Sequence, residues 1–182
     1  SKKRAASDFH HEAVTSIVDA LQKDEEADTI QLELQALKLS SNAEDKQVRR
    51  AVAVSFMKRI AGLVDAGSSP KDAVNAVIPA KKLLIQRAVL TDAEKFDEQA
   101  EFLLFVQSDL VHRSQGNKIL LNAAYALSTE DLVEAEGFEM WWMDERSTAN
   151  DGLREVRKET EPLVTALVGD DDEEESSGEE SD

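Results

Sequence analysis

The chain has 182 residues, 41% of them hydrophobic and 32% charged, with a formal net charge of −17 and no cysteine. This length and balance are typical of a folded protein with one core or two small ones. The acidity argues against nucleic acid as a partner, because phosphate binding needs a basic face. The lack of cysteine excludes thiol chemistry and fits a reducing compartment, and no apolar run approaches the roughly 18 residues that span a membrane. We therefore expect a cytoplasmic protein without a membrane partner.

Almost all of the chain before residue 169 has the apolar spacing of amphipathic helices. Glycine and proline are scarce, and β-branched residues rarely alternate with polar ones, so the sequence gives little support for strands. The predicted helices cover residues 9–22, 29–39, 44–66, 68–90, 91 or 92 to 112, 117–127, 132–145 and 151–168.

Several residues predict where these helices begin, end or break. Asp28 is placed to cap the second helix, and Gly67 to end the third. Pro70 suits a first helical turn, whereas Pro79 should kink or split the helix that contains it.

The short connections between these helices favour antiparallel packing of neighbours, and hence an all-α stack of helical hairpins, an α-solenoid. No exact period is visible, so the hairpins would be irregular repeats. We expect one helical domain over residues 1–169. Residues 170–182 contain nine acids and no base, which predicts a disordered acidic tail.

The sequence shows no arrangement of residues that would support covalent catalysis. The three histidines, His10, His11 and His112, favour solvated or capping roles, and no glycine-rich phosphate loop is present. We therefore expect no metal, no cofactor and no making or breaking of covalent bonds.

The first acidic box, residues 91–105, combines acids with aromatic residues. Glu94, Asp97, Glu98 and Glu101 follow helical spacing and form one stripe, in which like charges repel one another. A solvated surface is one interpretation of this stripe. The other is a basic partner, because a face of one sign offers no internal pairing.

The second acidic box, residues 132–145, contains both tryptophans of the chain. Adjacent residues on a helix point about 100° apart, so one indole should be buried and the other should lie at the rim. A rim indole beside carboxylates suits lysine or arginine of a partner, and burial of both rings as packing is the alternative. The tryptophans and acids of this box are Glu134, Glu136, Glu139, Trp141, Trp142, Asp144 and Glu145.

The helix at 29–39 has a broad predicted apolar arc, in which one face holds Ile30, Leu34 and Leu37 and the next holds Leu32, Ala36 and Leu39. Glu33 falls within this arc, between Ala36 and Leu37, where a carboxylate must be desolvated or find a partner. Arg49 or Arg50 could be a structural partner. The alternative is an acid that protrudes at a functional surface.

With these residues, the chain resembles the C-terminal catalytic region of the epsilon subunit of eukaryotic translation initiation factor 2B. Three features carry the resemblance: "LELQALKLSSN" at 32–42, the acidic and aromatic stretch 91–111, and "STEDLVEAEGFEMWWMDE" at 128–145 before a final helix and acidic tail. Within the last stretch, "EAEGFEMWW" alone is shared more loosely with the C-terminal domains of initiation factors 5 and 4-gamma. The early segment is more particular to the epsilon subunit.

The resemblance implies a HEAT-like helical domain that catalyses guanine-nucleotide exchange on the gamma-subunit GTPase of initiation factor 2. Glu33 matches the exchange-critical glutamate of the family. Other subunits of factor 2B would be bound through an N-terminal part absent from this sequence. The two boxes would bind lysine-rich segments of the factor 2 beta subunit through Asp97, Glu98, Glu101, Glu134, Glu136, Glu139, Trp141, Trp142, Asp144 and Glu145.

The chain also departs from the family pattern. Leu163 and Ala166 stand where aromatic residues are expected in the last helix, and Ala135 replaces a frequent acid. Two other functions therefore stay open: an adaptor domain of the factor 5 or 4-gamma type that binds basic segments without exchange, and a helical scaffold whose acids only keep it soluble.

Overall fold

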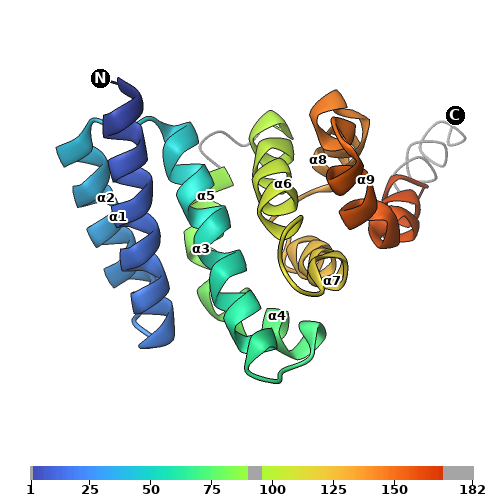
Figure 1. Cartoon of the computed structure of the whole chain (residues 1–182), viewed down its shortest axis with the longest axis horizontal. Coiled ribbons are helices and arrows are strands. Elements are labelled where there is room, and N and C mark those ends of the chain that lie inside the picture. Colours follow the sequence, from blue (N-terminus) through green and yellow to red (C-terminus); the bar gives the residue numbers. More distant parts are fainter. Residues whose placement is uncertain (1, 90–95, 170–182) are drawn as a thin grey trace, which may run out of the picture.

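The computed structural model describes the backbone of residues 2–89 and 96–169. Across these residues the chain is all-α, without strands, and the helices form the expected HEAT-like stack (Figure 1). The α-helices are α1 (Lys2–Gln22), α2 (Ala27–Ser41), α3 (Asp45–Asp65), α4 (Pro70–Val77), α5 (Lys82–Val89), α6 (Phe96–Leu110), α7 (Gly116–Thr129), α8 (Ala135–Met143) and α9 (Asp151–Arg157). Short 3₁₀ turns are η1 (Pro79–Lys81), η2 (Glu145–Thr148) and η3 (Lys158–Thr160), and residues 161–169 are again helical.

Several predicted helix boundaries are confirmed, but α1 begins at Lys2, seven residues before the predicted start at Phe9. Pro70 is the first residue of α4, whose N-cap Ser69 accepts a hydrogen bond from the backbone N–H of Asp72 at 3.1 Å. Pro79 begins a 3₁₀ turn that separates α4 from α5. Gly67 follows α3 with a φ of 114°, which a glycine adopts without strain.

The prediction that Asp28 caps the second helix is wrong. Helix α2 begins two residues earlier than expected, with Glu26 at the N-cap, so Asp28 lies in the first turn. There its charge still favours the helix N-terminus, and its carboxylate pairs with Arg87 at 3.2 Å.

The last two predicted helices are interrupted. Asp144 is extended, and its side chain accepts a hydrogen bond from the backbone N–H of Arg146 at 2.8 Å, so α8 ends and η2 begins. The turn η3 interrupts the final segment in the same way. The predicted helix start at Thr91 or Asp92, Glu94 of the first acidic box and the disordered tail at 170–182 all lie outside the described residues.

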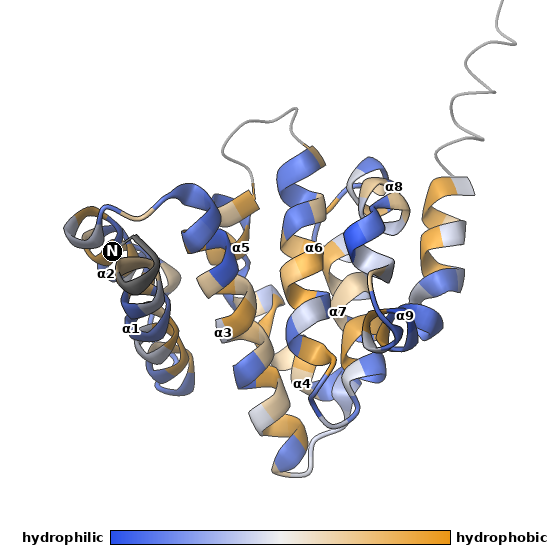
Figure 2. Cartoon of the chain, turned by 45° about the horizontal axis from the view of Figure 1, so that its top comes forward, coloured by the Kyte–Doolittle hydropathy of each residue, from blue (hydrophilic) through white to orange (hydrophobic). Residues whose placement is uncertain are grey.

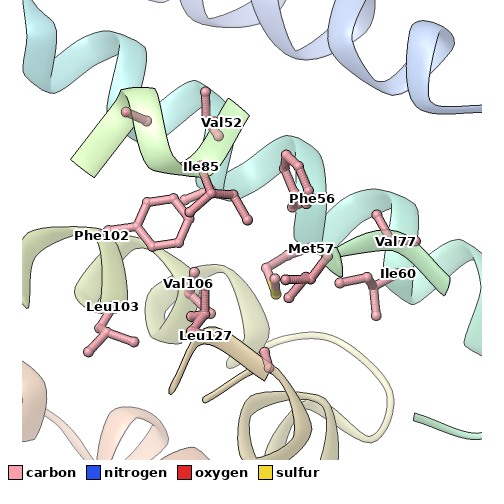
Figure 3. Packing of buried hydrophobic residues seen from close by; sticks show 14 of the residues in the cluster. Val52, Phe56, Met57, Ile60, Val77, Ile85, Phe102, Leu103, Val106 and Leu127 are labelled. Carbon is pink, nitrogen blue, oxygen red and sulfur yellow. The ribbon is translucent and has the colours of Figure 1, made fainter. Parts of the chain in front are cut away.

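The centre of the core lies between α3 and α6 (Figure 3). Side chains of α3 point toward α6, and helices α4, α5 and α7 close the sides of this cluster. The central residues include Val52, Phe56, Met57, Ile60, Val77, Ile85, Phe102, Leu103, Val106 and Leu127. None of the described helices is both long and apolar enough to cross a membrane.

Helices α2 and α8 lie in different parts of the stack. Helices α1 and α2 form one end of the row, whereas α8 and α9 lie beyond α6, toward the other end (Figures 1 and 2). The early motif with Glu33 and the second acidic box are therefore separated by the central core.

Candidate protein-docking sites

Glu33 is exposed on α2 and faces the side of α1. The hydroxyl of Ser16 on α1 donates a hydrogen bond to Oε2 of Glu33 at 3.4 Å. Neither Arg49 nor Arg50 pairs with this carboxylate, so of the two alternatives the structural arginine partner is wrong and the exposed, protruding acid is the one observed. Glu33 also contributes to the raised pKa of Lys23, although the main cause is the hydrogen bond from Lys23 to Asp19.

Beside Glu33, helix α2 presents an apolar stripe to solvent. Leu32 is 73% exposed and Leu39 79%, and Ala36 between them is exposed as well. The prediction that these three residues belong to a buried arc is wrong, because α2 lies at the edge of the stack and buries only the face with Ile30 and Leu34. Exposed leucines at this spacing mark a surface that can bind another protein.

Two of the three described acids of the first acidic box, Glu98 and Glu101, are engaged inside the molecule. The buried Arg49 of α3 donates to Glu101 through Nη1 at 2.6 Å, and its Nη2 lies 3.5 Å from Glu98. Its Nε donates to the carbonyl of Ala88 at 3.0 Å, and Lys46 lies 3.6 Å from the other oxygen of Glu101. The expectation that this stripe has no internal pairing is therefore wrong. Glu98 and Glu101 stabilise the packing of α3, α5 and α6.

Asp97 differs from these two acids. It lies in the first turn of α6 with an exposed side chain, and it makes no ion pair with a described residue. Among the described acids of the first acidic box, Asp97 is thus the one most open to a partner.

In the second acidic box, Trp141 is the buried tryptophan. Its indole Nε1 donates to Oε1 of Gln107 at 3.0 Å. The amide nitrogen of Gln107 donates in turn to the carbonyls of Ser147 and Leu153, at 2.8 and 3.0 Å. Gln107 is fully buried and was not identified from the sequence. The available signal was a polar residue on the apolar face of its helix, four residues after Leu103.

Trp142 lies half-buried at the edge of the helix packing, and a side chain of the same protein covers its ring. The guanidinium carbon of Arg157 lies 3.7 Å from the ring centroid of Trp142. Nη1 of Arg157 donates to the carbonyl of Trp142 at 2.8 Å and to the hydroxyl of Ser147 at 3.0 Å. Burial lowers the pKa of Arg157, although the nearby Glu161 opposes this. A cation on this ring, assigned to a partner in the sequence analysis, is therefore supplied by the chain itself.

The remaining acids of the second acidic box form two groups. Asp144 pairs with Arg146, with oxygen–nitrogen distances of 2.7 to 3.3 Å, and this hydrogen bonding holds the pKa of Asp144 below its usual value. The others have exposed side chains that form no ion pair with a described residue: Glu134, Glu136, Glu139 and Glu145. Among the described residues of the two boxes, these four and Asp97 make up the accessible acidic surface.

A glutamine also holds the start of α8 against α6. The backbone N–H of Glu134 donates to Oε1 of the buried Gln99 at 2.9 Å. A Cβ atom at Gly137 would lie 2.9 Å from the Cβ of Gln99 and closer still to its amide oxygen. The two helices therefore approach closely, and the glycine within "EAEGFEMWW" permits this contact.

The three histidines lie in different environments. His11 and His112 are exposed, but His10 is half-buried between α1 and α3, where burial and the charge of Arg50 lower its pKa. Among the described residues, no group of three or more histidine and carboxylate side chains could hold a metal ion.

Comparison with known proteins shows similarity to translation initiation factors. A protein-family model described as "W2: eIF4-gamma/eIF5/eIF2-epsilon" matches residues 98–177, which supports a W2 domain in this part of the chain. The chain is also 28% identical over 141 residues to translation initiation factor eIF2B subunit epsilon of Schizosaccharomyces pombe. That alignment covers 78% of this chain and 20% of the relative, so the chain spans about a fifth of the relative's length.

Proposed function

We propose that this chain promotes GDP release from translation initiation factor 2, and that the carboxylate of Glu33 is its active group. The similarity to eIF2B subunit epsilon supports a role in translation initiation. The observation that carries the finer proposal is the placement of Glu33, exposed and hydrogen-bonded to Ser16, beside the solvent-facing leucines of α2.

Nucleotide exchange needs no covalent chemistry. The exchange factor must bind the nucleotide-free GTPase more tightly than the GDP-bound form, because a ligand shifts an equilibrium only through differential affinity. Leu32 and Leu39 would supply apolar contact with the gamma subunit. Glu33, placed near the phosphate site, would repel the β-phosphate or draw away the P-loop lysine or the Mg²⁺ ion. Ser16 would orient the carboxylate.

The second acidic box has a different part in this proposal. Its exposed acids, together with Asp97, would bind lysine-rich segments of the beta subunit and keep factor 2 on the domain. Trp141 and Trp142 would act indirectly: the first packs inside α8, and the second holds Arg157. Glu98, Glu101 and Asp144 are engaged by arginines of the chain, so their contribution to a partner would be small.

The test is release of a fluorescent GDP analogue from factor 2, with and without this chain. We expect faster release with the unchanged chain and loss of most of this acceleration with Glu33→Ala. Asp65→Ala removes an exposed acid at the end of α3 and should behave like the unchanged chain. Equal acceleration by Glu33→Ala, in a chain shown to be folded by circular dichroism, would contradict the role of Glu33.

An adaptor domain without exchange activity is the second candidate. The observation that favours it is the extent of the W2 match, which includes the second acidic box but not α2, and whose description also names eIF4-gamma and eIF5. The same experiment separates the two functions. An adaptor would bind factor 2 without changing the rate of GDP release.

A further inference from the structure

Two methionines lie on the exposed face of α8. Met140 is 40% exposed and Met143 76%, whereas Gly137, Phe138 and Trp141 form the buried face of this helix. The exposed face has the helical order Glu136, Glu139, Met140 and Met143, at spacing i, i+3, i+4 and i+7. Acidic and thioether side chains therefore share one continuous surface.

This surface differs from the tryptophan surface predicted from the sequence. Trp141 is buried and bonded to Gln107, and the ring of Trp142 is covered by Arg157. The open apolar area of the helix is therefore contributed by Met140 and Met143. Methionine is flexible and polarizable, and it often serves surfaces that must adapt to a partner.

We propose that Met140 and Met143 form the apolar floor on which a lysine-rich partner segment lies, and that this floor favours lysine over arginine. The inference rests on the proposed docking of basic segments and names the residues that would select them. The aliphatic stem of a lysine can lie along a thioether while its ammonium group reaches Glu136 or Glu139.

The preference for lysine follows because arginines of the chain itself already occupy the groups that would favour an arginine of a partner. Arginine gains most from an aromatic face and from bidentate pairing with a carboxylate. In this box the ring of Trp142 is held by Arg157, and the carboxylate of Asp144 by Arg146. The exposed thioethers and single carboxylates that remain suit a flexible stem with a compact charge.

Charge complementarity also identifies the occupant as a basic segment. A second copy of this chain would bring the same acids against the surface, and like charges at close range repel. The net charge of −17 adds to this repulsion.

The methyl groups of the methionines can report binding directly by NMR. The chain contains three, and Met57 is buried between α3 and α6, so it serves as an internal control. With ¹³C-methyl methionine, NMR spectra of the full chain would be recorded during titration with oligolysine and with oligoarginine of equal length. We expect the Met140 and Met143 signals to shift, the Met57 signal to stay, and oligolysine to bind more tightly.

A variant removes the apolar contact without touching the core. Met143→Gln should weaken oligolysine binding about fivefold, as loss of one apolar contact of about 1 kcal/mol predicts. Tyr125→Gln changes an exposed apolar residue of α7 and should leave the affinity unchanged.

Three results would overturn the inference: binding without shifts of Met140 and Met143, equal affinity of Met143→Gln, or tighter binding of oligoarginine. Each of these would leave the proposed exchange function standing if GDP release is still accelerated. Failure of exchange alone, with the methionine shifts present, would overturn the proposed function and keep this docking surface.

Discussion

Gln107 is the residue on which the second acidic box depends most. One buried amide accepts from the indole of Trp141 and donates to two carbonyls, those of Ser147 and Leu153. It therefore connects α6 with α8, η2 and α9. A buried network of this kind is stable only while all its members are satisfied.

We expect Gln107→Leu to lower the free energy of unfolding by about 3 kcal/mol, because one buried donor and two buried acceptors lose their partner. Urea denaturation followed by tryptophan fluorescence measures this change. Gln86→Leu, at an exposed position of α5, should change stability little. A loss of less than about 1 kcal/mol for Gln107→Leu would mean that water replaces the amide.

The errors of prediction at the residue scale have a common physical cause. Helical spacing predicted that Leu32 and Leu39 lie in a buried arc. They are exposed because the apolar spacing of a helix does not show whether the helix lies at the edge of the fold or between other helices. It also left Glu98 and Glu101 without internal partners, because spacing along α6 carries no information about Arg49 on α3. The position of Glu33 as an outlying acid was visible in the sequence, but its neighbour Ser16 was not.

At the scale of elements, the close approach of α6 and α8 determines how the acidic surface is presented. Gly137 allows this approach, and the side chain of Gln99 accepts a hydrogen bond from the backbone N–H of Glu134, just before α8. The helices themselves and most of their boundaries could be predicted, since apolar period and proline positions are local signals. The breaks at Asp144 and at η3 could not, because they depend on side-chain bonds and tertiary packing.

Two glycine substitutions test this contact. Alanine is favoured over glycine within a helix by about 1 kcal/mol. Gly62→Ala on α3, where a Cβ would meet nothing within 4 Å, should therefore stabilise the protein. Gly137→Ala should instead destabilise it by about 2 kcal/mol, because the added carbon meets Gln99. Thermal unfolding of both variants measures the change in stability. Equal stabilisation of the two variants would contradict close packing at Gly137.

At the scale of the whole molecule, acidity is the dominant property. With a net charge of −17, attraction for a lysine-rich segment should be long-ranged and sensitive to salt. We expect the affinity for oligolysine to fall about tenfold between roughly 0.1 and 0.5 M salt, since exposed charges are screened over a few ångströms at the higher value. Fluorescence anisotropy measures this dependence, and circular dichroism at each salt concentration checks the fold. A constant affinity would indicate that apolar contact alone holds the segment.

The separation of α2 and α8 along the stack determines how a partner can be held. A partner whose folded domain lies on α2 can also contact α8 through a second, tethered segment, because the central core lies between the two helices. Such a partner binds bivalently: once one contact forms, the tether sets the effective concentration of the other, and two weak contacts give one strong attachment. The rigid core between the two surfaces then specifies the length of tether that fits, so the architecture distinguishes partners by reach as well as by chemistry.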